Sequence, residues 1–256
     1  MNPKVLIIGC GVVGSNVREK LAKLNPDVVD KFKPELTHYD PNAEYDFAYV
    51  CVDTPFNEKG DCDTTEVFNA VRDNNAKVFV IKSTILPYTT ERVKHETGKR
   101  VVFSPEFYGG TQHCNNWRFN FTILGGDIAD CVAVQQMLQL VFDARHIFRF
   151  TNSSTAELVK YMENAYLATK VSFFVAFFQI AEKLGVCYET LRELVTLDPR
   201  IGKSHSFVYR DKPYWDTHCL NKDVPAIANF TQNNFLLSLV DFNADCKKSA
   251  QSESDT

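Results

Sequence analysis

Three glycines near the N-terminus have the spacing of a dinucleotide-binding turn. Residues 9–14 read Gly-Cys-Gly-Val-Val-Gly, directly after the apolar run of residues 4–8 and before a helical pattern. In this context Gly9 permits a tight turn, Gly11 lets the backbone approach a pyrophosphate, and Gly14 lets the helix pack closely on the strand. The pyrophosphate would sit on the N–H groups and positive dipole of the helix N-terminus. The pattern therefore predicts a dinucleotide cofactor.

An acidic residue at the end of the next strand would choose between the two nicotinamide dinucleotides. We expect that strand over residues 36–39, followed by Asp40. A carboxylate there binds both hydroxyls of the adenosine ribose and repels a 2'-phosphate. The spacing from Gly14 is longer than the usual ~20 residues, and an ordinary loop aspartate is the alternative interpretation. With Asp40 in this role, the sequence predicts NAD rather than NADP.

Alternating strands and helices must position these residues. Strands are expected over residues 47–52, 77–81, 101–103 and 121–124, and helices over residues 12–24, 64–74 and 129–142. Short connections between alternating elements predict a doubly wound parallel sheet, here an α/β Rossmann domain over residues 1–150. Ligands bind beyond the carboxyl ends of such strands, where Thr54, Thr84 and Glu106 lie.

A long helix over residues 154–185 is predicted to organise the remainder of the chain. Ser154 and Glu157 have the spacing of a capping box at its start. Lys160 and Asn164 are four residues apart and therefore share one helix face. At 1.5 Å per residue the helix spans roughly 45 Å, so we expect it to bridge two domains and two subunits. An ordinary core helix with surface charges is the alternative interpretation.

A smaller helical domain is expected over residues 151–246, with the long helix at its centre. The second half of that helix carries an aromatic ridge, formed by Phe173, Phe174, Phe177 and Phe178. A short helix is predicted over residues 188–196 and a last helix over residues 219–245. The polar tail of residues 247–256 is predicted to be disordered.

The composition excludes several classes of protein. A net charge of −4 gives no general affinity for nucleic acid or anionic membranes. No apolar run approaches the eighteen or so residues of a membrane span. The eight cysteines show no paired spacing and no CxxC, so we expect reduced thiols in the cytoplasm and no metal site.

Several motifs, in this order, resemble those of the UDP-glucose/GDP-mannose dehydrogenase family. After the glycine turn they are CVDTP (51–55), KSTILP (82–87), SPEF (104–107), AELVKYMENAYLATKVSF (156–173), DPRIG (198–202) and CLNKD (219–223). The resemblance covers nearly the whole chain, and the last four motifs are specific in combination. It implies oxidation of the C6 alcohol of a nucleotide sugar to a carboxylate, with two hydride transfers to NAD and a covalent cysteine intermediate. For UDP-glucose the product would be UDP-glucuronate.

The resemblance also implies a role for each matching residue. Cys219 matches the nucleophile, which forms a thiohemiacetal and then a thioester. Lys160 and Asn164 match the pair that stabilises the developing oxyanion. Asp223 matches the carboxylate that handles protons together with an ordered water.

Further matches concern hydrolysis and binding. Glu106 matches the glutamate implicated in hydrolysing the thioester, and Thr84 matches the residue that positions the water. Arg200 matches an arginine that reaches the sugar across a dimer interface, and the long helix matches the dimer core. The expected cofactor contacts are Gly9, Gly11, Val12, Val13, Gly14, Asp40, Val52, Thr54, Thr84 and Lys222. The expected sugar contacts are Glu106, Phe107, Tyr108, Lys160, Asn164 and Arg200.

Three departures from the family pattern affect the expected substrate. The family has a glycine-rich GxGGxC loop before the nucleophile, whereas residues 214–219 read Tyr-Trp-Asp-Thr-His-Cys. The family's PEFLxEG loop lacks its acidic residue here. A third domain that binds the nucleotide diphosphate is expected to be missing, so a partner chain or an unusual dimer would supply that clamp.

Two other functions stay open at this stage. Two-domain 3-hydroxyacid or 6-phosphogluconate-like dehydrogenases combine an NAD domain with a lysine–asparagine pair on a long helix, and they need no cysteine. A non-catalytic NAD-binding module that completes a longer partner is the other alternative. Turnover that survives the loss of Cys219 would favour the first, and NAD binding without turnover would favour the second.

Overall fold

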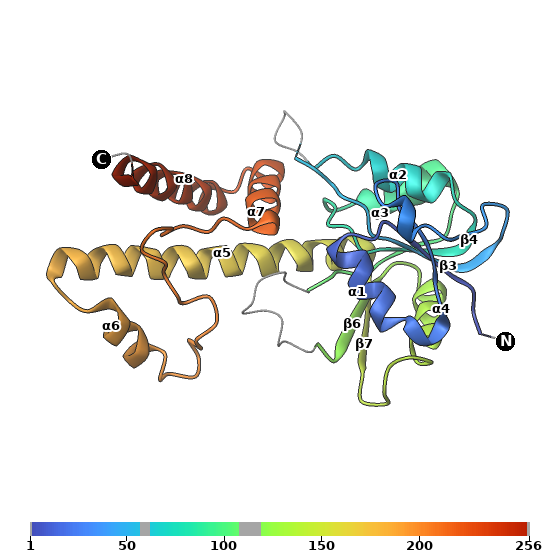
Figure 1. Cartoon of the computed structure of the whole chain (residues 1–256), viewed down its shortest axis with the longest axis horizontal. Helices are drawn as coiled ribbons and strands as arrows, with labels where there is room; N and C mark the ends of the chain where they lie inside the picture. The colour runs from blue at the N-terminus through green and yellow to red at the C-terminus, as the bar shows by residue number, and fades with distance from the viewer. Residues whose placement is uncertain (1, 57–61, 108–118, 255–256) are drawn as a thin grey trace. The chain divides into compact units, whose positions relative to one another are not determined.

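The computed structural model describes residues 2–56, 62–107 and 119–254 (Figure 1). The chain divides into two compact units: an N-terminal unit that runs through Lys160, and a C-terminal unit that starts at Tyr161. The boundary therefore falls inside the long helix, later than the predicted boundary after residue 150. Among the described helices, none is both long and apolar enough to cross a membrane.

Among the described residues of the N-terminal unit, a sheet of seven strands lies at the centre. The strand order is β2-β1-β3-β4-β5-β6-β7, and neighbours are parallel except for β5 and β6. The strands are β1 (Val5–Ile8), β2 (Asp27–Val29), β3 (Tyr45–Val50), β4 (Ala76–Ile81), β5 (Val101–Phe103), β6 (Phe121–Gly125) and β7 (Ile147–Thr151). The predicted doubly wound α/β fold is confirmed.

Helices cover both faces of this sheet. They are α1 (Val12–Lys20), α2 (Thr65–Arg72), α3 (Thr89–Thr97) and α4 (Ile128–Leu138). Because side chains alternate along a strand, Val5 and Ile7 of β1 join one core with α1 and α4. Leu6 and Ile8 join the other core, with α2 and α3. Figure 1 shows the two pairs of helices on opposite sides of the sheet.

The sheet order reverses next to β1, which has β2 on one side and β3 on the other. The carboxyl ends of β1 and β3 thus flank the crevice where doubly wound sheets bind ligands. The second strand of the sheet is β2, so the strand predicted over residues 36–39 is wrong. Leu36 is the last residue of a 3₁₀ turn at Pro34–Leu36, and His38 makes an antiparallel bridge to Val28.

The C-terminal unit is built from helices. The long helix α5 (Ser153–Leu184) continues into it, followed by α6 (Tyr188–Val195), α7 (His218–Thr231) and α8 (Asn234–Ser254). Gln232 adopts a left-handed conformation between α7 and α8. The single last helix predicted over residues 219–245 is therefore two helices, and residues 247–254, predicted to be disordered, belong to α8.

Two details of α5 differ from prediction. Asn152 Oδ1 accepts hydrogen bonds from the Thr155 N–H and the Ser154 hydroxyl, so Asn152 rather than a capping box satisfies the helix start. The aromatic ridge is divided between the interior and the surface. Phe174 and Phe178 are buried with Ala181 and Tyr188, whereas Phe173 and Phe177 are exposed.

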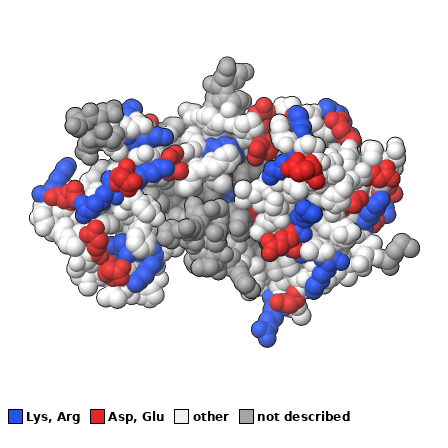
Figure 2. Space-filling model, in the orientation of Figure 1, with Lys and Arg blue, Asp and Glu red and all other residues white. Residues whose placement is uncertain are grey.

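Charged side chains of both signs are interspersed over the face of the molecule shown in Figure 2. This distribution agrees with the small net charge of −4. The described side chains of this face form no broad basic field of the kind that attracts nucleic acid.

Candidate active site

The glycine turn lies at the carboxyl end of β1 with the geometry that its sequence predicts. Gly9 has φ +86°, and a Cβ added there would lie 2.7 Å from the Cys51 carbonyl oxygen. A Cβ added to Gly14 would lie 1.9 Å from the Gly9 oxygen, so α1 packs on the turn only because Gly14 has no side chain. An added Cβ at Gly11 would meet no atom within 4 Å, which leaves the start of α1 open.

This opening fits a dinucleotide pyrophosphate. Gly11 is the N-cap of α1 and offers no side chain to the first-turn N–H groups. Those N–H groups and the helix dipole favour an anion at this position. Val12 is exposed beside the opening, and Val13 packs partly against the core. Residues 9–14 therefore have the geometry that the sequence predicts for a pyrophosphate-binding turn.

Asp30, and not Asp40, follows the second strand of the sheet. Its Oδ2 accepts a hydrogen bond from the Cys10 N–H at 2.5 Å, and its Oδ1 accepts the N–H groups of Phe32 and Lys33. Burial alone would raise the pKa of Asp30, but these N–H groups and the Lys33 ammonium together lower it. Asp40 instead lies in a later turn, where its Oδ1 accepts the Asn42 N–H.

Sequence reasoning missed Asp30 because the strand before it is only three residues long. The available signal was the pair of β-branched valines in Asp27-Val-Val-Asp30, which resembles a short buried strand ending in an acid. Asp30 touches the glycine turn directly, so it is placed to bind the ribose that adjoins the pyrophosphate.

The loops that follow β3 and β4 are joined to one another. The buried Thr54 hydroxyl donates to the Thr84 carbonyl oxygen at 2.8 Å, and the Ser83 hydroxyl donates to the Val52 carbonyl oxygen at 2.6 Å. These bonds hold Thr54 and Thr84 beyond the carboxyl ends of neighbouring strands, as predicted. Val52, predicted as the last residue of its strand, also lies beyond the end because β3 stops at Val50. Ser83 was not singled out from the sequence, although it carries one of the two bonds.

Glu106 follows β5 and is buried between two lysines. Its Oε2 lies 3.4 Å from Lys82 Nζ, and its Oε1 lies 3.5 Å from Lys20 Nζ. Lys82 also donates to the Ser104 hydroxyl at 3.3 Å and to the Pro105 carbonyl oxygen at 3.1 Å. Burial lowers the pKa of Lys82, although Glu106 opposes that effect. Lys82 is a further charged group at this edge of the sheet that sequence reasoning did not assign.

Lys160 is the last residue of the N-terminal unit and is buried there. Its Nζ lies 5.5 Å from the centroid of the Phe107 ring. Phe107 in turn contacts the rings of Phe119 and Phe121. The structure therefore brings Lys160 and Phe107 together, as expected for two sugar contacts. Tyr108 lies outside the described residues.

A buried carboxylate fixes the start of α5 against the loop after β4. Glu157 is fully buried and accepts the N–H groups of Tyr88 and Thr90 at 2.7 and 2.8 Å. It also accepts the Thr90 hydroxyl at 2.6 Å. Glu157 thus caps the first turn of α3 from another helix, three residues before Lys160. This role replaces the capping box predicted for it.

In the C-terminal unit, three of the predicted residues form a polar cluster, and two of them are buried. The Asn164 amide on α5 donates to Asp223 Oδ2 on α7 at 2.6 Å. The other oxygen of Asp223 lies 2.6 Å from Lys222 Nζ. Asn164 and Asp223 are both buried. Asp223 is thus held by an amide and an ammonium group, an arrangement suited to a carboxylate that exchanges protons.

Cys219 lies in the first turn of α7 with an exposed thiol. Thr217 is the N-cap of the helix, and its hydroxyl accepts the Leu220 N–H at 3.3 Å. The positive end of a helix dipole favours a thiolate over a thiol. Cys219 and Asp223 are four residues apart on α7, so they lie on one helix face.

Arg200 is presented on the surface of the C-terminal unit by a rigid loop. Its side chain is 88% exposed, and its guanidinium group binds both oxygens of Asp198. Lys170 of α5 fixes the next residues by donating to the Ile201 and Gly202 carbonyl oxygens at 2.8 and 3.1 Å. An exposed arginine–carboxylate pair contributes little free energy, so the guanidinium can exchange Asp198 for another anion.

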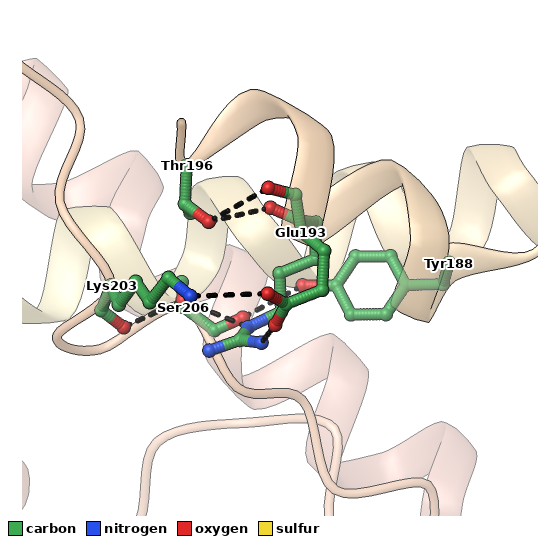
Figure 3. A network of polar contacts seen from close by, with 6 residues as sticks. Tyr188, Glu193, Thr196, Lys203 and Ser206 are labelled. Atoms are coloured by element: carbon green, nitrogen blue, oxygen red, sulfur yellow. Dashed lines mark hydrogen bonds and ion pairs between the residues drawn. The ribbon is translucent and has the colours of Figure 1, made fainter. Parts of the chain in front are cut away.

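The same loop is held at its far end by the network in Figure 3. The buried Arg192 of α6 donates from Nε to the Ser206 hydroxyl at 2.9 Å. Its guanidinium lies 3.6 Å from the centroid of the Phe207 ring. Tyr188 donates to the Ser206 carbonyl oxygen at 2.9 Å, and Ser206 donates to the Lys203 carbonyl oxygen. This network fixes the backbone after Arg200.

Two family models match the chain in succession. The UDP-glucose/GDP-mannose dehydrogenase family, NAD binding domain, matches residues 30–143, and the central domain of the same family matches residues 154–244. The first match spans strands β3 to β6, and the second reaches from α5 into the first half of α8.

Known proteins agree with this assignment. An uncharacterized protein of Methanocaldococcus jannaschii is 33% identical over 189 residues, which are 68% of this chain and 21% of that protein. The UDP-glucose 6-dehydrogenase of Rickettsia prowazekii is 25% identical over 259 residues, which are 88% of this chain and 59% of that enzyme. The chain thus spans less than two thirds of the length of these relatives.

A solved structure shows the same fold. The UDP-D-ManNAc dehydrogenase of Pyrococcus horikoshii superposes with a TM-score of 0.79 at 21% identity, over 97% of this chain and 70% of that one. The chain carries the family's NAD-binding domain and its central domain in the family order. It therefore belongs to the UDP-glucose/GDP-mannose dehydrogenase family.

Proposed function

We propose that this chain oxidises the C6 alcohol of a nucleotide sugar of the UDP-glucose type to the carboxylate, through a thioester on Cys219. The observation that carries the proposal is the polar cluster of Asn164, Asp223 and Lys222, one helical turn from Cys219. Bound NAD supplies the hydride acceptor for both oxidation steps. The open start of α1 and the Asp30 carboxylate are the features of this chain that fit NAD.

The first oxidation requires a base for the proton of the C6 hydroxyl. Asp223 is held ready for that role by Asn164 and Lys222, with one oxygen facing each partner. A water next to Asp223 would carry the proton from the alcohol. The product of this step is the C6 aldehyde.

The second oxidation begins when the Cys219 thiolate adds to the aldehyde carbon. The new C–S bond gives a thiohemiacetal, and loss of the C6 hydrogen as hydride leaves a thioester. Lys160 and Asn164 are the donors that stabilise the oxyanion formed at each stage. Hydrolysis then breaks the C–S bond, releases the carboxylate and returns Cys219 to the thiol. Glu106 and Thr84 are assigned to the attacking water.

We further propose a homodimer formed through α5, in a reducing compartment such as the cytoplasm. Phe173, Phe177, Ile180 and Leu184 are all exposed and recur along one face of the helix. An apolar stripe of this kind supports association with a second copy. The dimer would also bring the exposed Arg200 of each copy toward its partner's substrate.

The first experiment measures NADH formation with NAD and a panel of UDP-sugars, GDP-mannose and free sugar phosphates. The panel is run with the unaltered chain, Cys219→Ser and Cys187→Ser. Cys187 is an exposed thiol in the same unit and serves as the matched control. We expect two NADH per molecule of one nucleotide sugar, abolished only in Cys219→Ser.

Other outcomes would contradict the proposal in different ways. Undiminished turnover in Cys219→Ser would favour a hydroxyacid or sugar-phosphate dehydrogenase without covalent catalysis. NAD binding with no turnover on any sugar would favour a binding module that completes a partner chain. Preference for UDP-N-acetylmannosamine over UDP-glucose would keep the mechanism and change the substrate.

A further inference from the structure

The residues just before Cys219 depart from the glycine-rich loop of the family, and the proposed reaction does not explain them. Residues 214–218 read Tyr-Trp-Asp-Thr-His, with two large aromatic side chains and one acid. A loop without glycine has fewer backbone conformations available. Contacts between its side chains and the rest of the C-terminal unit hold this loop in place.

Trp215 joins this loop to both neighbouring long helices. Its N–H donates to Asn243 Oδ1 of α8 at 2.9 Å, and its carbonyl oxygen accepts from Asn243 Nδ2 at 3.0 Å. Its indole N–H donates to the Ser172 hydroxyl of α5 at 3.1 Å. All three residues are buried, so these hydrogen bonds do not compete with water and are costly to lose.

Asp216 fixes the next residue of the loop. One carboxylate oxygen accepts the Asn221 amide of α7 at 2.6 Å and lies 3.7 Å from Lys247 of α8. The other oxygen lies 2.7 Å from Lys212 Nζ. Hydrogen bonds from Lys212 and Asn221 lower the pKa of Asp216 to about 2, so it is ionised throughout the neutral range. The negative charge of Asp216 is thus balanced by lysines of the same chain.

We infer that Trp215 and Asp216 replace the glycine-rich loop in positioning Cys219, with Asn243 as the positioning residue that holds Trp215. Asn243 fixes both polar groups of the Trp215 backbone, and Asp216 is bound to α7 itself. The N-cap Thr217 is then held between two fixed residues and the helix. The first turn of α7, which carries Cys219, keeps its place for that reason. The inference rests on the proposed role of Cys219 as nucleophile.

The test measures the reactivity of Cys219 without any substrate. The whole chain is alkylated with iodoacetamide over a range of pH, and the rates at Cys219 and Cys187 are followed in the same sample by peptide mass spectrometry. Asn243→Leu keeps the side-chain volume but removes both bonds to Trp215. We expect the Cys219 rate relative to Cys187 to fall about three- to fivefold near neutral pH, the range of a helix-terminus effect. The pH of half-maximal alkylation should move upward.

Two further variants separate positioning from general stability. Asn234→Leu makes the same change at an exposed position of α8 and should leave the ratio unchanged. Ser172→Ala removes only the indole bond and leaves both bonds from Asn243, so it should change the ratio less than Asn243→Leu. A purely structural role would lower the unfolding temperature of Asn243→Leu without changing the ratio measured on the folded chain.

The inference would be overturned if the Cys219-to-Cys187 alkylation ratio in Asn243→Leu rises, or if it cannot be distinguished from the ratio in Asn234→Leu. That result would leave the proposed reaction standing, because the reaction depends on Cys219 and not on how its loop is held. Conversely, full turnover in Cys219→Ser would contradict the proposed reaction. It would not change the alkylation ratios measured in the unaltered chain and in Asn243→Leu, which both keep Cys219. The two failures are therefore distinguishable.

Discussion

At the scale of single residues, two aspartates near the glycine turn give opposite expectations for NAD binding. Asp30 accepts the Cys10 N–H of the turn, whereas Asp40 lies beyond the 3₁₀ turn and binds Asn42. We expect Asp30→Asn to weaken NAD binding about tenfold or more, because it removes a charged acceptor from the ribose site. Asp40→Asn should leave the affinity unchanged. Calorimetric titration of NAD into both variants measures the difference, and weaker binding in Asp40→Asn with unchanged binding in Asp30→Asn would restore Asp40 as the ribose acid.

The contacts of Glu106 lead to a second prediction at this scale. Lys82 is the buried one of its two lysine partners and also holds the backbone beside it. In Lys82→Met the carboxylate would lose its buried lysine partner and keep the more exposed Lys20 and the Phe107 N–H. We expect turnover to fall about 10²-fold, with the thioester accumulating on Cys219 after the first two NADH are released.

Acid quench followed by mass spectrometry of the Cys219 peptide detects this intermediate. Glu106→Gln is the positive reference, because it alters the carboxylate directly. Lys31→Met is the matched control, since Lys31 pairs with Glu66 on the surface. Accumulation in Glu106→Gln without accumulation in Lys82→Met would separate Lys82 from the hydrolysis step.

At the scale of secondary structure, the sequence was informative wherever an element was an unbroken apolar run or a long periodic pattern. The strands around Val5 and Val101 and the helix α5 were predicted close to their observed bounds because each is a continuous or clearly periodic pattern. The three-residue strand β2 and the break at Gln232 were missed because neither carries proline, glycine or a long pattern.

The residues of the candidate site also fall into two groups, those that a local sequence pattern identifies and those that it does not. Motif residues such as Cys219 and Asp223 could be named from the sequence, because each stands in a local pattern. Partners from distant positions could not, since no local spacing joins Lys82 to Glu106 or Trp215 to Asn243. Those pairs depend on how strands and helices pack, which the sequence alone does not specify.

Glu157 connects two elements, α3 and α5, and makes their contact depend on pH. Burial raises the pKa of Glu157, although hydrogen bonds from Thr90 and Tyr88 oppose the shift. A carboxyl whose pKa is higher in the folded chain than its ordinary 4.5 binds protons on folding. The stabilisation of the folded chain by Glu157 is present below pH 4.5 and is lost as the pH rises through the pKa that Glu157 has in the folded chain. The free energy of unfolding therefore declines across that window.

We expect Glu157→Gln to flatten this decline. Each pH unit by which the pKa of Glu157 in the folded chain exceeds its pKa in the unfolded chain corresponds to about 1.4 kcal/mol of unfolding free energy. Urea unfolding of both proteins at a series of pH values above 4.5 measures the two slopes. Glu66→Gln, at an exposed surface pair, should keep the slope of the unaltered chain. An identical slope in Glu157→Gln would contradict the buried carboxyl as its cause.

At the scale of the whole molecule, the two units contribute different chemistry. The N-terminal unit holds the glycine turn, Asp30 and the paired Glu106, and the C-terminal unit holds Cys219 with the Asn164–Asp223 pair. The comparisons agree, because the two family models match the two units in the same order. Each unit has its own apolar core, which lets each set of side chains be fixed independently.

The second half of α5 carries the prediction that concerns assembly. Phe174 and Phe178 are buried in the core with Tyr188, so they cannot serve an interface. Phe173 and Phe177 lie on the exposed side, with ring centroids 4.8 Å apart. Phe177→Glu would place a charge in the middle of this apolar stripe, and burying it between two subunits would be costly.

We therefore expect Phe177→Glu to convert a dimer to a monomer in light scattering, while NAD binding is retained because every expected cofactor contact except Lys222 belongs to the N-terminal unit. Phe235→Glu is the matched control, since Phe235 is an exposed phenylalanine on α8 of the same unit. It should leave the dimer intact. A monomeric unaltered chain at micromolar concentration, or a Phe177→Glu variant that remains dimeric, would show that this face of α5 does not hold two copies together.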